Sequence, residues 1–97
     1  GVHEISNRAR EFQLLDVRAP EEWEEGHIPG AIHHFIGEMK KSLPKLEKDK
    51  PVAAYCATGY RASLAASLLK RKGLDAHNIP GSWQAWKSAG FPVEKDR

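Results

Sequence analysis

The chain has 97 residues, of which 40% are hydrophobic and 29% are charged, and its formal net charge is +2. A length in this range gives one small domain with a single core, and the composition excludes disordered and fibrous sequences. The net charge is too small to indicate a nucleic-acid partner, and no apolar run reaches the roughly 18 residues that cross a membrane. We therefore expect residues 1–97 to form one domain with no nucleic-acid or membrane partner.

The first residues and the cysteine content indicate the setting in which the chain works. It begins with Gly1 in place of Met and shows no signal-peptide pattern, so we expect a domain excised from a longer protein. A single cysteine excludes an intrachain disulfide and fits a reducing compartment, which predicts a cytoplasmic location. The histidines show no metal-ligand spacing, because the adjacent His33 and His34 would point to opposite faces of a strand. We expect no metal site.

Strands and helices are expected to alternate along the first half of the chain. Residues 12–17 form a short apolar run that predicts a buried strand. A helix should begin at Pro20 and end at Gly26, because proline and glutamates suit the first turn of a helix. A second short apolar segment covers residues 31–35, and residues 2–6 are interpreted as an edge strand.

The second half continues this alternation. Residues 37–49 have the apolar spacing of a helix, although Pro44 should kink or break it. The unbroken apolar run 51–56 predicts a strand covered on both faces, as in a parallel sheet. Residues 74–79 are expected to form another strand, and Ser82 is expected to cap a last helix.

The clearest helix is predicted over residues 60–72. Its apolar stripe is expected to contain Leu64, Leu68, Ala65 and Leu69, and Gly73 follows as the stop signal. Strands that alternate with helices across short links indicate an α/β domain with a largely parallel sheet.

Cys56 is predicted to lie at the end of strand 51–56, where the chain must turn into a helix. This junction gathers backbone N–H groups and a helix N-terminus around the sulfur, and both stabilise a thiolate. Gly59 allows a tight loop, and Arg61 adds a positive charge nearby. The alternative is a buried structural thiol, since free cysteine is often a small core residue.

Three segments of the chain, in the same order, resemble signatures of the rhodanese family. LLDVR (14–18) followed by PEEWEEGHIPGAI (20–32) resembles the family's Asp-Val-Arg strand end and its Gly-His-Ile-Pro-Gly-Ala turn. YCATGYRA (55–62) resembles the active-site loop Cys-x-x-Gly-x-Arg, and GSWQAWKSAGFPV (81–93) resembles the closing segment. The resemblance spans nearly the whole chain. It implies a three-layer α/β fold with a mainly parallel sheet of about four to five strands and helices on both faces.

The same resemblance implies a sulfurtransferase in which Cys56 is the nucleophile and carries a persulfide. The backbone N–H groups of the following loop would surround the outer sulfur. This loop consists of Ala57, Thr58, Gly59, Tyr60 and Arg61. Asp16 and Arg18 fall on the family's Asp-x-Arg beside the loop, and their supporting role is expected to be mainly structural.

Three further residues of the matching segments have structural interpretations. His27 is expected to stabilise the turn in which it lies. Trp83 and Trp86 are expected to pack in the core, because their apolar spacing serves packing well.

The resemblance also implies the reactants. The sulfur donor would be thiosulfate or a low-molecular-weight persulfide such as glutathione persulfide, and a thiol or cyanide would accept the sulfur without a metal or organic cofactor. Members that prefer thiosulfate often place basic residues after the cysteine, whereas this chain has the neutral Ala57 and Thr58. CATGYRAS and the Gly-Ser-x-x-Ala-Trp ending look like the rhodanese domains of metallo-β-lactamase-fold persulfide dioxygenases. They imply such a domain, fused or associated, as a partner.

Two other functions stay open. Cysteine phosphatases and arsenate reductases use a similar loop, Cys-x5-Arg, but the loop here is Cys-x4-Arg, one residue shorter. A non-catalytic rhodanese-like interaction domain is the second alternative, although domains that have lost catalysis commonly lack the cysteine that is present here.

Overall fold

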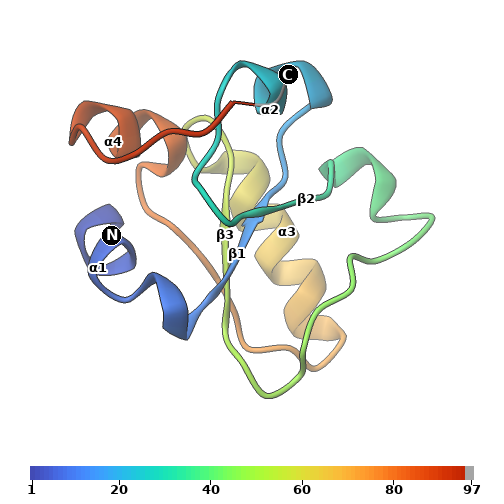
Figure 1. The fold of residues 1–97 in the computed structure, drawn as a ribbon. Helices are drawn as coiled ribbons and strands as arrows, with labels where there is room; N and C mark the ends of the chain where they lie inside the picture. The colour runs from blue at the N-terminus through green and yellow to red at the C-terminus, as the bar shows by residue number, and fades with distance from the viewer. Residues whose placement is uncertain (96–97) are drawn as a thin grey trace.

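The computed structural model describes residues 1–95, in which short helices and strands alternate (Figure 1). In chain order the elements are α1 (Val2–Asn7), the 3-10 helix η1 (Ala9–Glu11), β1 (Gln13–Asp16), α2 (Pro20–Glu25), β2 (Ile32–His33), the 3-10 helix η2 (Ile36–Glu38), β3 (Val52–Tyr55), α3 (Tyr60–Arg71), β4 (Ala76–Asn78) and α4 (Ser82–Ser88). None of the helices in this described part has the length and apolar character needed to span a membrane.

The strands form one four-stranded sheet in the order β2–β1–β3–β4, and every neighbouring pair is parallel. β1 and β3 lie at its centre, with Leu15 paired to Ala54 and Asp16 paired to Tyr55. Every residue of these two strands is buried, in agreement with the apolar character of both segments. The predicted α/β fold with a parallel sheet is confirmed.

Helices cover both faces of the sheet, so the domain has three layers. Figure 1 shows α3 on one side of the strands and α1 and α4 on the other. The core on the α3 side consists of Leu15, Val17, Met39, Val52, Ala54, Cys56, Ala62, Ala65, Ala66, Leu69 and Ala76. The core on the other side consists of Val2, Ile5, Leu14, Ile28, Ala53, Tyr55, Ile79, Trp83 and Trp86.

The edge strand predicted for residues 2–6 is wrong, because this segment forms helix α1. Val2 and Ile5 are three positions apart, so a helix places both on one face. Both side chains are buried in the core layer that contains α4. This burial favours the helix over an edge strand.

The helix predicted for residues 37–49 is also wrong, since only the short 3-10 helix η2 forms near its start. The remainder runs as irregular chain past Pro44, which cannot continue a helix. Met39 is buried and Leu46 packs against the same core, so the apolar spacing serves an irregular segment that covers the α3 side.

Helix α3 forms as predicted, but its apolar stripe is only partly correct. Ala62, Ala65, Ala66 and Leu69 face the core. Leu64 and Leu68, which were expected in the same stripe, are 45% and 38% exposed. Small alanines let α3 lie close to the sheet, and the two leucines remain on its outer side.

Candidate active site

The chain turns from β3 into α3 through a short loop at the carboxyl end of the sheet. β3 ends at Tyr55, so Cys56 is the first residue after the strand rather than its last. Gly59 is the N-cap residue of α3 and has a φ of +129°, a value that residues with a side chain rarely adopt. A Cβ atom at Gly59 would have no neighbour within 4 Å, so backbone conformation and not crowding requires glycine there.

The sulfur of Cys56 accepts hydrogen bonds from the start of α3. Cys56 is 1% exposed, and its Sγ accepts the backbone N–H of Gly59 at 3.0 Å and that of Ala62 at 3.3 Å. These N–H groups have no carbonyl partner within the helix, and they carry the positive end of the helix dipole. Two donors and the positive end of the helix dipole are therefore directed at the Cys56 sulfur.

The start of α4 holds the other side of this loop. Ser82 does not cap α4 as predicted, because Gly81 is the N-cap residue and Ser82 is the first residue of the helix. Its Oγ instead accepts the N–H of Cys56 at 3.2 Å and donates to the carbonyl of Ile79 at 3.1 Å. The N–H groups of the next two residues donate to the loop carbonyls, from Trp83 to Cys56 at 2.8 Å and from Gln84 to Ala57 at 3.0 Å. The loop backbone is thus fixed from α4 as well as from α3.

Arg61 of the loop forms an ion pair with Glu22 of α2. Its two terminal nitrogens lie 2.7 and 3.0 Å from the two carboxylate oxygens. The hydrogen bond from Arg61 lowers the pKa of Glu22, and the same contact raises the pKa of Arg61. Glu22 also accepts the N–H of Ala19 at the start of α2. Arg61 therefore joins α3 to α2, and its positive charge is balanced by a carboxylate.

Asp16 and Arg18 form a buried pair beside the loop. The Arg18 Nη2 lies 2.8 Å from Asp16 Oδ2 and donates to the carbonyl of Gly26 at 2.6 Å. The guanidinium also lies over the ring of Trp83, at 4.6 Å from its centroid. These contacts connect the end of β1 with the end of α2 and with α4. These contacts are structural, and the supporting role of the pair at the active site stays a prediction.

Tyr55, directly before Cys56, is an uncharged anchor for the adjacent turn. Burial raises the pKa of Tyr55 far above its usual range, and the charge of Asp16 raises it further. The phenol oxygen accepts the N–H of Ile28 at 3.0 Å. This bond ties the 27–32 turn to the strand that carries Cys56.

His27 lies within that turn and is buried. Its Nδ1 is 2.8 Å from the carbonyl oxygen of Trp23, and its ring stacks on the Trp23 ring with centroids 3.4 Å apart. Its backbone pairs with Glu94 in an isolated antiparallel bridge. These contacts place His27 in the support of the turn, as expected.

The two tryptophans of α4 are buried, so their predicted place in the core is confirmed. Trp83 additionally lines a hollow of about 450 Å³ that opens beside the loop. The walls of this hollow combine both charges with apolar surface, from Arg18, Glu22, Glu25, Gly26, Ala57, Trp83, Lys87, Val93 and Lys95. The hollow is large enough for a small organic molecule.

Of the predicted loop residues, Gly59 donates to the Cys56 sulfur and Arg61 contacts α2, and the structure adds three residues that sequence reasoning missed. Glu22 is the partner of Arg61, Ser82 fixes the backbone of Cys56, and Ala62 is the second donor to the sulfur. Thr58 and Tyr60 point outward, and Tyr60 is 76% exposed. The glutamate cluster in residues 21–25 could have indicated an acidic partner for Arg61. The sequence around Ser82 indicated only an ordinary helix cap.

Metal binding finds no support among residues 1–95, where no group of three or more histidine, cysteine, aspartate or glutamate residues is arranged to hold an ion.

Comparisons with known proteins identify a family and several relatives to which this chain is similar. The family model described as rhodanese-like domain matches residues 2–89. The protein YqhL of Bacillus subtilis is 37% identical over 78 residues, which cover 79% of this chain and 62% of YqhL. A protein of Coxiella burnetii named thiosulfate sulfurtransferase GlpE is 29% identical over 82 residues, which cover 84% of this chain and 77% of GlpE.

A solved structure shows the same fold. The crystal structure of a rhodanese-related protein from Thermoplasma volcanium superposes with a TM-score of 0.91 at 32% sequence identity. The match covers 97% of this chain and 94% of that one.

Proposed function

The chain belongs to the rhodanese-like domain family, and we propose that it is a sulfurtransferase that carries sulfur as a persulfide on Cys56. The observation that carries the proposal is the position of Cys56 Sγ, which accepts the N–H groups of Gly59 and Ala62 at the start of α3. The name of the Coxiella relative, thiosulfate sulfurtransferase, supports the same reaction class.

In the first step, the Cys56 thiolate attacks the outer sulfur of a donor such as a persulfide, R–S–SH. A sulfur–sulfur bond forms to Cys56 while the donor's own sulfur–sulfur bond breaks, and the thiolate R–S⁻ leaves with the bonding electron pair. With thiosulfate as the donor, sulfite leaves instead. The backbone donors of Gly59 and Ala62 hold the attacking sulfur in place before the reaction begins.

In the second step, an acceptor thiolate or cyanide attacks the outer sulfur of the Cys56 persulfide. The bond between this sulfur and Cys56 breaks, and Cys56 returns as a thiolate with the electron pair. The product is a new persulfide, or thiocyanate with cyanide. The two N–H donors and the dipole of α3 stabilise the departing thiolate, so the same contacts assist both steps.

The hollow beside Ala57 supports a low-molecular-weight persulfide as the donor. It has about 450 Å³ of space, more than thiosulfate requires. Its walls bear the cations Lys87 and Lys95 and the carboxylate of Glu25, which suit a donor that bears charges of both signs. Glutathione persulfide, with its carboxylates and its ammonium group, has that character. We accordingly expect a higher kcat/KM for glutathione persulfide than for thiosulfate.

Glu22 argues against the phosphatase and arsenate reductase alternative. An oxyanion bound in the loop would require a free arginine, but both terminal nitrogens of Arg61 already contact Glu22. A carboxylate at this position also repels a phosphate dianion. The non-catalytic alternative is disfavoured by the retained cysteine and by its two sulfur-directed donors.

The test is a steady-state assay of the wild-type chain and the Cys56→Ser variant. Each is given thiosulfate or glutathione persulfide as the donor and cyanide as the acceptor, and aryl phosphate hydrolysis is measured in parallel. We expect sulfur transfer by the wild type and a loss of about 10³-fold or more in the variant. Phosphatase turnover without sulfur transfer, or a fully active variant, would contradict the proposal.

The setting of the reaction remains part of the proposal. A cytoplasmic location and a fused or associated metallo-β-lactamase-fold domain are predictions that rest on the sequence. The match spans less than two thirds of YqhL. The proposal therefore concerns the activity of this domain and not the activity of a longer protein.

A further inference from the structure

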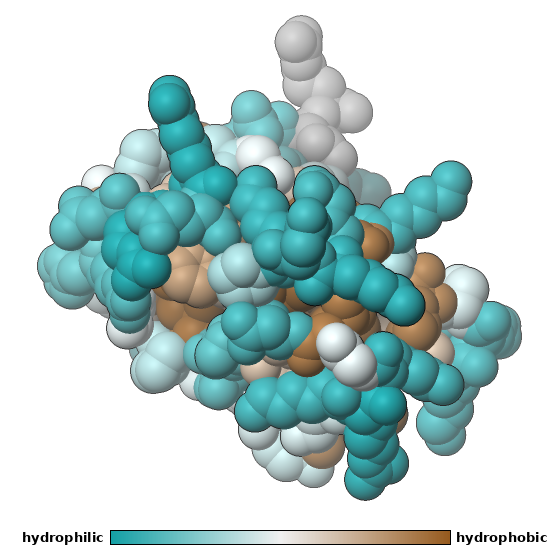
Figure 2. Space-filling model, turned by 90° about the horizontal axis from the view of Figure 1, so that it is seen from below, coloured by the Kyte–Doolittle hydropathy of each residue, from teal (hydrophilic) through white to brown (hydrophobic). Residues whose placement is uncertain are grey.

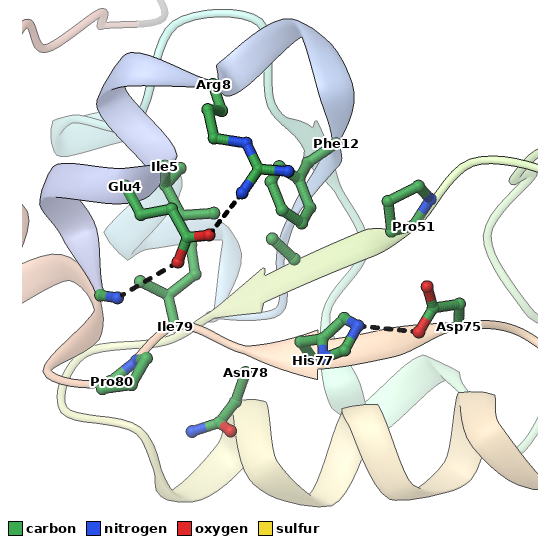
Figure 3. Close-up of a pocket in the computed structure, with 12 residues that line it drawn as sticks. Glu4, Ile5, Arg8, Phe12, Pro51, Asp75, His77, Asn78, Ile79 and Pro80 are labelled. Atoms are coloured by element: carbon green, nitrogen blue, oxygen red, sulfur yellow. Dashed lines mark hydrogen bonds and ion pairs between the residues drawn. The ribbon is translucent and has the colours of Figure 1, made fainter.

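A second hollow, which we call the α3 groove, lies at the end of α3 that is remote from Cys56. It has a volume of about 290 Å³ and is lined by Met39, Lys40, Leu43, Leu68, Arg71 and Lys72. Arg71 is eleven positions beyond Tyr60, or roughly 16 Å along the helix axis. Figure 2 looks at the end of the molecule where α3 finishes, and hydrophobic atoms are exposed there between hydrophilic side chains.

Exposed leucines form the apolar part of this surface. Leu43 and Leu68 line the groove and are each 38% exposed, and Leu64, one helical turn before Leu68, is 45% exposed. Core alanines pack α3 against the sheet, so Leu64 and Leu68 are not needed for the contact between the helix and the sheet. Clustered apolar side chains with a polar rim are typical of a surface that binds a partner.

The rim of the groove is entirely basic. Lys40, Arg71 and Lys72 are exposed, and no carboxylate lies among the lining residues. Within residues 1–95, none of these three cations forms an ion pair. Their charges are therefore available to a partner of opposite sign.

We propose that the α3 groove binds an acidic helical segment of a partner protein. One large apolar side chain of the segment would enter the groove between Leu43 and Leu68, and neighbouring carboxylates would pair with Lys40, Arg71 and Lys72. A hollow of about 290 Å³ is small for an organic ligand but suits one anchoring side chain. A symmetric contact with a second copy would bring these basic rims together, and like charges disfavour it.

The shape of the groove favours a protein segment over a membrane surface as its binding partner. Membrane association requires apolar side chains that protrude into the bilayer, whereas Met39 is buried and the lining residues enclose a hollow. A hollow accepts a side chain that protrudes from the partner. Nucleic acid fits less well, because interfaces with nucleic acid are highly polar and this surface contains three leucines.

The test uses isotope-labelled protein and a synthetic helical peptide in which glutamates surround two leucines one turn apart. We expect amide chemical shifts to change at residues 39–43 and 64–72, and we expect the affinity to fall as salt is added. A control peptide with serine in place of both leucines should bind at least about tenfold more weakly.

Two variants and a charge-reversal control locate the interaction on the protein. Leu68→Ser and the double variant Arg71→Glu with Lys72→Glu should each weaken peptide binding by about tenfold or more. Arg10→Glu reverses one positive charge, half the charge change of the double variant, at an exposed position of η1 in the opposite layer, and should leave the affinity within about twofold. All variants should retain sulfur transfer from small donors to cyanide.

Several outcomes would overturn the proposal. It fails if the peptide causes no shifts, if the shifts map elsewhere, or if the serine peptide binds equally well. It also fails if anionic vesicles or an oligonucleotide bind the α3 groove and the peptide does not. None of these results bears on sulfur transfer at Cys56, which is measured separately.

Discussion

The two ends of α3 are built in opposite ways. At its first turn, the N–H groups of Gly59 and Ala62 bond to the sulfur of Cys56, and Arg61 contacts Glu22 with both terminal nitrogens. At its last turns, the outer leucines are exposed and the cations of the α3 groove have no ion-pair partner within residues 1–95. The first end is fixed for chemistry before a substrate arrives, whereas the second has groups available for binding.

The difference begins with the composition of the helix. Alanines at positions 62, 65 and 66 let α3 pack closely on the sheet, so the start of the helix is held near Cys56. The same close packing leaves no inward place for Leu64 and Leu68. The small core residues thus hold the start of α3 near Cys56, and helical periodicity places the two leucines on the outer face.

The largest expected effect on stability comes from comparing a leucine on the buried side of α3 with one on its exposed side. Leu69→Ala should lower the free energy of unfolding by about 2–5 kcal/mol, because Leu69 is fully buried. Leu68→Ala should lower it by less than about 1 kcal/mol, because Leu68 is on the exposed side. Urea denaturation of the two variants measures the difference. Equal losses would mean that Leu68 packs in the core as the sequence pattern predicted.

The next effect compares the glycines at the two ends of α3. Gly59 has a φ of +129° and Gly73 a φ of +89°, and an added Cβ would meet no atom within 4 Å at either position. Replacing either with alanine should therefore cost a similar stability, about 1–2 kcal/mol from backbone strain.

Activity should distinguish these two variants, because Gly59 donates its N–H to the Cys56 sulfur and Gly73 does not, so backbone strain at position 59 would displace a donor. We expect Gly59→Ala to lower kcat for sulfur transfer by about tenfold or more, and Gly73→Ala to retain kcat when assayed well below its melting temperature. Equal kcat values in the two variants would show that the backbone conformation at position 59 does not affect the reaction.

The smallest expected effect comes from the ion pair between Glu22 and Arg61. The pKa of Glu22 is lower in the fold than in the unfolded chain, so the pair stabilises the fold above the unfolded pKa of about 4.3. This contribution is lost as the pH falls through the lowered pKa of the folded state. Because the pair is partly exposed, Glu22→Gln should cost only about 0.5–1 kcal/mol at neutral pH.

Unfolding of wild type and Glu22→Gln, measured between pH 3 and pH 7, checks the sign of this effect. The stability difference should be constant near neutral pH and should shrink toward the acid end. A difference that grows as the pH falls would contradict the assignment of Glu22 as a charged partner of Arg61.

The sequence predicted those parts of the fold that depend on local pattern. A short apolar run identified β1, an unbroken apolar run identified β3, and the glycines and proline marked the ends of α2 and α3. The place of Cys56 at the carboxyl end of a parallel strand followed from the same pattern.

The remaining features depend on contacts between segments that are distant in the sequence. The spacing of Val2 and Ile5 suits one face of a helix, but that only one face of this segment is buried becomes clear when the layer containing α4 is known. Nothing near Ser82 indicates that its hydroxyl would bond to Cys56, which lies 26 positions earlier. Arg61 was correctly placed in the loop, but its partner Glu22 lies 39 positions away on another helix.

The most direct test of the central claim is the intact mass of the chain after exposure to glutathione persulfide or thiosulfate and then to an acceptor thiol. The account predicts that the wild type gains the mass of one sulfur atom, that the acceptor removes it, and that Cys56→Ser gains none. The absence of any gain from both donors, or an equal gain by the serine variant, would contradict the claim that Cys56 carries the sulfur.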